Sequence, residues 1–141
     1  MPTNTEKQIL VLHGPNMNLI GLASSRRGTR LTLDRINQHL RKQVRNTCFT
    51  LKIFQTHDES KAVSFLHRNR KKASAILLSP GPWLQNAFVL KDTLDLLNKP
   101  YAAVSFTKRE SAIFTENQIF FNEDPMTAYL TGLEKLITIL E

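Results

Sequence analysis

The sequence predicts a doubly wound α/β protein in which helices cover both faces of a parallel sheet. Short apolar runs alternate along the chain with longer segments that carry apolar residues every three or four positions. This alternation is typical of βαβ units, whose right-handed crossovers produce a parallel sheet. Five expected strands suit the flavodoxin-like order 2-1-3-4-5 in a three-layer αβα architecture. We expect residues 1–141 to form one domain.

Each expected strand is an apolar run. The five runs are QILVLHG (8–14), CFTLKIF (48–54), ASAILLSPG (73–81), YAAVSF (101–106) and QIFFNE (118–123). Helices are expected after Thr32 as N-cap, over residues 58–70, and over residues 83–97 as one helix. The last helix should follow Asp124, because Pro125 suits the first helical position. GLASSRRGTR (21–30) is expected to be a loop.

Composition is that of an ordinary globular protein with a basic charge. The apolar share is 41%, the charged share is 22% and the net charge is +7, which attracts anions but names no partner. The one cysteine, Cys48, cannot form an intrachain disulfide, so we expect a reduced, cytoplasmic setting and a small packing residue at a strand start. We expect no secretory signal and no association with a membrane.

Ligands of doubly wound sheets bind beyond the carboxyl ends of the strands. The segments expected there are residues 13–18, 56–59, 79–86 and 105–110. In HGPNMN, the turn Gly14-Pro15 precedes Asn16, whose amide suits either a ligand or a backbone group. His13 stands at the end of the first strand as a catalytic, ligand-contacting or simply hydrogen-bonded group.

Three further motifs each have a functional and a structural interpretation. Arg26 and Arg27, in the loop 21–30, suit either a mobile cationic cover over an anion or a solvated basic loop. The helix start at Trp83 is either a seat for a carboxylate or phosphate or a core position. The basic run HRNRKK (67–72) could contact nucleic acid, but cations at a helix end also complement its dipole, so nucleic acid is not expected.

No histidine, cysteine or carboxylate spacing indicates a metal site. No Gly-rich phosphate-binding motif or nucleophile elbow is present, and no cofactor is expected.

The order of these motifs resembles the type II 3-dehydroquinate dehydratases (type II dehydroquinases) over nearly the whole chain. The pattern G-P-N-x-N-L-x-G ends the first strand, a Q-[ST] turn follows the second, and a P-G turn follows the third. The matching residues are Gly14, Pro15, Asn16, Asn18, Leu19, Gly21, Thr32, Leu33, Gln55, Glu59, Pro80, Gly81, Leu90, Asp92, Pro100 and Val104.

The resemblance implies removal of water from 3-dehydroquinate without metal or cofactor. It implies a lid tyrosine as base with an arginine that lowers its pKa, asparagines at the ends of the first and third strands, a histidine that ends the fourth strand, and a substrate-binding arginine. It also implies a dodecamer built from trimers, in which an aspartate reaches a neighbour's pocket.

At the corresponding positions this sequence differs. His13 and Ser79 stand in place of the asparagines, and Arg26 or Arg27 in place of the tyrosine. The lid arginine falls near Ala23, and the later arginine near Ala112. Gln85 replaces a substrate-contacting histidine, Ala103 a strand-4 glutamate and Ser105 the strand-4 histidine. The tyrosines of the chain are Tyr101 and Tyr129, and no histidine follows His67. Asp92 matches the aspartate that reaches a neighbour, although it also suits a helix surface.

We therefore expect a diverged, catalytically inactive homologue that binds a small anionic ligand or a partner. The expected ligand-binding residues are His13, Asn16, Arg26, Arg27, Ser79, Gln85, Asp92, Ser105, Phe106 and Thr107, with His13 as a weak catalytic candidate. One alternative is an active dehydratase with a relocated apparatus, in which His13 or His57 is the base and arginines hold the anion. The other is a basic nucleic-acid-binding module.

Overall fold

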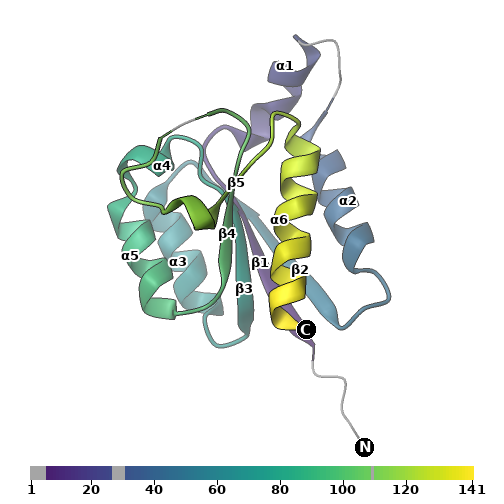
Figure 1. Cartoon of the computed structure of the whole chain (residues 1–141), viewed down its shortest axis with the longest axis vertical. Coiled ribbons are helices and arrows are strands. Elements are labelled where there is room, and N and C mark those ends of the chain that lie inside the picture. Colours follow the sequence, from purple (N-terminus) through teal and green to yellow (C-terminus); the bar gives the residue numbers. More distant parts are fainter. Residues whose placement is uncertain (1–5, 27–30, 109) are drawn as a thin grey trace, which may run out of the picture.

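A parallel sheet of five strands forms the centre of the molecule (Figure 1). The computed structural model describes residues 6–26, 31–108 and 110–141. The strands are β1 (Lys7–His13), β2 (Phe49–Gln55), β3 (Ala73–Ser79), β4 (Tyr101–Ser105) and β5 (Ile119–Phe121), in the order β2-β1-β3-β4-β5. The predicted flavodoxin-like order is therefore confirmed. His13 lies in register with Gln55 and Ser79, so three strand ends meet at one edge of the sheet.

Helices α2 (Leu33–Val44) and α6 (Pro125–Leu140) cover one face of the sheet. Ile36 and Leu40 of α2 and Leu133 and Leu136 of α6 are buried against the strands. Both helices begin where the sequence predicts. The Thr32 side chain accepts the backbone N–H of Arg35, and the Asp124 carboxylate accepts that of Thr127, with proline in the first turn of α6.

Helices α3 (Glu59–Asn69), α4 (Trp83–Asn86) and α5 (Phe88–Leu97) cover the opposite face (Figure 1). Phe65 and Leu66 of α3 pack there with Leu90 and Leu94 of α5. Trp83 is only 5% exposed and belongs to the same cluster, so its side chain is part of the core.

The helix predicted over residues 83–97 is broken in the structure. Ala87, with φ −87° and ψ 67°, separates α4 from α5. The break leaves backbone N–H groups at the start of α5 without acceptors in the helix. One of them, the backbone N–H of Leu90, donates to Glu59 Oε2 at 2.9 Å. Apolar residues at helical spacing run through both helices, so the periodicity alone does not reveal the break.

Two other local predictions are wrong. Residues 21–25 are not a loop, because a 3-10 turn η1 (Met17–Leu19) leads into helix α1 (Ile20–Ser25), while residues 27–30 lie outside the described residues. Cys48 is exposed and does not pack in the core, since strand β2 begins one residue later with the buried Phe49.

A second 3-10 turn, η2 (Glu116–Gln118), precedes β5. In the described part of the chain, no helix has the length and apolar character needed to cross a membrane.

The Glu59 contact gives a first prediction. Glu59→Ala should lower the free energy of unfolding by about 1–2 kcal/mol, because it removes a charged acceptor from the N-terminus of α5. Glu59→Gln retains an oxygen acceptor and should cost less. Urea denaturation measures both variants, and equal stability of wild type and Glu59→Ala would contradict the capping role.

Candidate functional site

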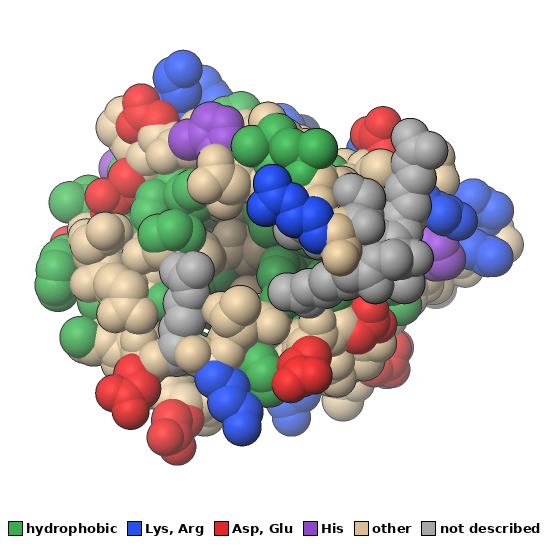
Figure 2. Space-filling view, turned by 90° about the horizontal axis from the view of Figure 1, so that it is seen from above, with side chains coloured by type: hydrophobic (Ala, Val, Ile, Leu, Met, Phe, Trp, Pro, Cys, Tyr) green, Lys and Arg blue, Asp and Glu red, His purple; other side chains and the backbone are tan. Residues whose placement is uncertain are grey.

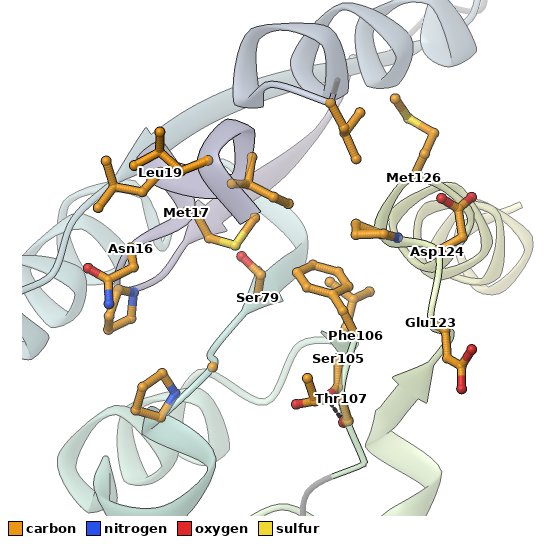
Figure 3. A pocket seen from close by; sticks show the side chains of 18 of the residues that line it. Asn16, Met17, Leu19, Ser79, Ser105, Phe106, Thr107, Glu123, Asp124 and Met126 are labelled. Carbon is orange, nitrogen blue, oxygen red and sulfur yellow. Dashed lines mark hydrogen bonds between the residues drawn. The ribbon is translucent and has the colours of Figure 1, made fainter. Parts of the chain in front are cut away.

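A cavity of about 950 Å³ opens at the carboxyl ends of β1, β3 and β4. Seen from above, this end of the molecule is hollowed, with hydrophobic side chains beside the hollow (Figure 2). The wall combines the turn after β1, the helix α1, the ends of β3 and β4, and the start of α6 (Figure 3). The lining residues are Pro15, Asn16, Met17, Leu19, Ile20, Leu22, Arg26, Leu31, Ser79, Gly81, Pro82, Val104, Ser105, Phe106, Thr107, Glu123, Asp124, Pro125 and Met126.

The turn after β1 is held tightly against the end of β3. The backbone N–H of Gly14 donates to Ser79 O at 3.0 Å. A Cβ on Gly14 would lie 2.4 Å from that same oxygen, so only glycine permits this approach. Asn16 then adopts a left-handed conformation with φ 65°, and its backbone N–H donates to His57 Nδ1 at 3.0 Å. These contacts place Asn16 and Met17 on one wall of the cavity (Figure 3).

Two serine hydroxyls lie where β3 and β4 end. Ser79 is 2% exposed and Ser105 is 8% exposed, and both line the cavity. The Ser105 hydroxyl donates to Thr107 O at 2.7 Å. Phe106, which follows Ser105, lies on the opposite side of Ser79 from Met17 (Figure 3). The deepest polar groups of the cavity are therefore uncharged.

Behind Ser79 lies a buried polar network. His13 Nδ1 is 2.7 Å from the Tyr129 hydroxyl oxygen, and His13 Nε2 is 2.7 Å from Asn37 Oδ1. The Tyr129 hydroxyl also hydrogen bonds to Ser79 Oγ at 2.6 Å. Tyr129 packs edge-on against His13 and at a tilt against Phe106. The network thus joins β1, β3, α2 and α6 directly beneath the cavity.

Burial keeps His13 neutral. His13 is fully buried, and desolvation lowers its pKa to about 4, although the hydrogen bond to Asn37 opposes the shift. Because Asn37 Oδ1 can only accept, Nε2 carries the ring hydrogen. Burial likewise raises the pKa of Tyr129, with the hydrogen bond to Ser79 acting against it. Both groups are uncharged near neutral pH.

The structure brings together six of the ten predicted ligand-binding residues. Asn16, Arg26, Ser79, Ser105, Phe106 and Thr107 line the cavity. His13 was expected at the mouth of the pocket, but its side chain lies fully buried behind Ser79 and is not part of the lining. Arg27 lies outside the described residues.

Gln85 and Asp92 lie away from this cavity. The Gln85 side chain is exposed and donates from Nε2 to Glu110 O at 2.5 Å. Asp92 is exposed on α5, which covers the other face of the sheet from α6. Neither residue lines the cavity within this chain.

Sequence reasoning missed one wall of the cavity and two members of the network. Glu123, Asp124, Pro125 and Met126 line the cavity from the start of α6. They follow β5, so the rule that ligands bind beyond carboxyl strand ends could have found them. Asn37 and Tyr129 carried no such signal, because only the fold brings them to His13.

Among the described residues, no three His, Cys, Asp or Glu side chains are grouped so that they could hold a metal ion. The titratable side chains that line the cavity are Arg26, Glu123 and Asp124. Asp124 is occupied in capping α6, where its Oδ2 accepts from the Thr127 backbone and hydroxyl.

Comparison with known proteins identifies the family. Residues 7–120 match the family described as Dehydroquinase class II. The chain belongs to this family. A curated 3-dehydroquinate dehydratase from Halothermothrix orenii is 31% identical over 106 residues, which cover 73% of this chain and 72% of the relative.

Solved class II dehydroquinase structures share the fold. A type II dehydroquinase from Propionibacterium acnes superposes with a TM-score of 0.79 at 22% identity, covering 96% of this chain and 99% of that one. The type II dehydroquinase from Butyrivibrio crossotus also gives 0.79, at 16% identity, covering 94% and 98%. The structural likeness therefore includes α6, whereas the family sequence match ends at residue 120. The wall from Glu123 to Met126, and Tyr129, come from beyond that match.

The buried histidine gives a second prediction. An unfolded chain protonates His13 near its ordinary pKa of 6.5, whereas the folded chain does so only near 4. The unfolded state therefore binds more protons in this window, and stability is lost as the pH falls from 6.5 towards 4. Between about pH 7.5 and about pH 5, His13 should account for a loss of about 2 kcal/mol.

Urea denaturation at the two pH values, with His13→Gln beside wild type, measures this loss. The variant should be less stable at the higher pH but should lose about 2 kcal/mol less on acidification. His39→Gln, on the exposed surface of α2, is the matched control and should behave as wild type. An identical acid response of all three proteins would contradict a neutral, buried His13.

Proposed function

We propose that this member of the class II dehydroquinase family does not dehydrate 3-dehydroquinate and instead binds a small molecule in its cavity. The observation that carries the proposal is the chemistry of the lining. Among the described residues that line the cavity there is neither a tyrosine nor a histidine. Elimination of water needs a base for the proton and an acid for the departing hydroxyl.

The tyrosines and histidines of the chain are placed elsewhere. Tyr129 is fully buried with a raised pKa, and Tyr101 lies at the start of β4, the end of the strand that is remote from Ser105. His13 has no exposed surface and a lowered pKa. His57 Nδ1 accepts the backbone N–H of Asn16, and His57 is not part of the lining. A relocated base at His13 therefore lacks access to a bound substrate, and His57 lies outside the lining.

The remaining charged groups suit binding better than elimination. Arg26 is exposed and lines the cavity, where it can pair with an anionic group of a ligand. Glu123 is an exposed carboxylate on the same cavity, and Asp124 is committed to the α6 cap. We therefore propose that Arg26 contacts the anionic group of any ligand that carries one.

A turnover assay tests the proposal. Purified protein at high concentration should produce no enone absorbance from 3-dehydroquinate above a protein-free control. The Halothermothrix orenii dehydratase, assayed in parallel, is the positive control. Protein-dependent product formation that survives repeated purification would contradict the proposal, and its loss on Glu123→Gln would identify the base.

We also propose that copies of this chain associate through α5. Phe88, Val89 and Leu96 on this helix are 64%, 62% and 77% exposed, beside the exposed Asp92. Such apolar exposure on one helix is typical of a contact surface.

Light scattering should therefore give a mass of at least twice 16.1 kDa. Leu96→Asp should lower the mass, whereas Ile139→Asp, at a comparably exposed position on α6, should not. A wild-type monomer would contradict association.

A further inference from the structure

We infer that the cavity selects an amphiphilic small molecule with an apolar aromatic or branched-hydrocarbon body and an uncharged hydrogen-bonding inner end. The inference rests on the proposed binding function and names the chemical class of its ligand.

The side chains that line the walls of the cavity determine which kind of ligand body fits. Most of the lining is apolar, and its members come from four segments: Met17 with Leu19, Ile20 and Leu22, then Leu31, then Val104 with Phe106, and finally Pro125 with Met126. Met17 and Phe106 face each other across Ser79, and Met126 projects from the start of α6 (Figure 3). Two methionines give these walls side chains that adapt to different ligand shapes. A volume of about 950 Å³ accommodates a ligand of ordinary small-molecule size.

The apolar surface continues outward to the mouth of the cavity. Leu19 and Leu22 line the cavity and yet are 48% and 58% exposed. Leaving two leucine side chains in water at a cavity entrance has a free-energy cost that an apolar ligand removes when it binds. Hydrophobic side chains beside the hollow are visible from above (Figure 2).

The polar groups deepest in the cavity determine which inner end of a ligand can bind. The Ser79 and Ser105 hydroxyls are the deep polar groups, and both are nearly buried. Ser79 is backed by neutral Tyr129 and neutral His13, so the network offers the ligand no charge. The charged lining residues Arg26, Glu123 and Asp124 are exposed. An ionised inner end would therefore be desolvated without a counter-charge.

The same geometry disfavours polyhydroxylated carboxylates. The apolar side chains of Met17, Val104 and Phe106 offer no partner to the hydroxyl groups of a compact polar acid, and a hydroxyl group buried without a partner is costly.

Fluorescence titration with N-phenyl-1-naphthylamine, an uncharged aromatic probe, tests the inference on the full chain. We expect saturable binding that 3-dehydroquinate does not displace. Leu22→Gln should weaken binding roughly fivefold, since it replaces apolar surface at the cavity mouth. Ile139→Gln, which changes a 52% exposed apolar residue on α6 away from the lining, should leave the affinity within about twofold of wild type.

The other outcomes separate this inference from the proposed function. Absent or non-saturable probe fluorescence, or equal effects of the two variants, would overturn the apolar ligand class. Displacement of the probe by 3-dehydroquinate without turnover would overturn the ligand class and leave the binding function in place. Turnover of 3-dehydroquinate would overturn the proposed function itself.

Discussion

The hydrogen bonds between His13, Tyr129, Ser79 and Asn37 are the constraint on which the site depends. They join the ends of β1 and β3 to the two helices on one face of the sheet, and their groups are buried or nearly so. A buried polar group without a partner is costly, so these side chains must be arranged together. The arrangement places a neutral network beneath the cavity, with Ser79 as the member that lines it.

This network ties the strand ends of the family fold to its C-terminal helix. The sheet order and the tight turn at Gly14 are retained, and solved type II dehydroquinases superpose over nearly the whole chain. His13, Ser79 and Ser105 stand at the strand ends. His13 and Ser79 are tied to Tyr129 of α6, in the segment beyond the family sequence match. A shared fold does not by itself fix function, which depends on the residues of the site.

The sequence predicted what depends on local pattern. Strand order followed from alternating periodicities, and the helix starts at Thr32 and Asp124 followed from cap chemistry, because both are read within a few residues. The break at Ala87 was missed because the acceptor that stabilises it, Glu59, comes from another helix. The burial of His13 was missed for the same reason, since Asn37 and Tyr129 lie 24 and 116 residues away in sequence.

We propose that no group in the cavity removes a proton from 3-dehydroquinate. Deuterium exchange tests this step alone, without requiring loss of the hydroxyl. The protein is incubated with 3-dehydroquinate in D₂O, and the hydrogens beside the substrate carbonyl are followed by NMR. Our account predicts exchange at the rate of the protein-free control. Protein-dependent, stereospecific exchange would contradict it, because a positioned base would then be present.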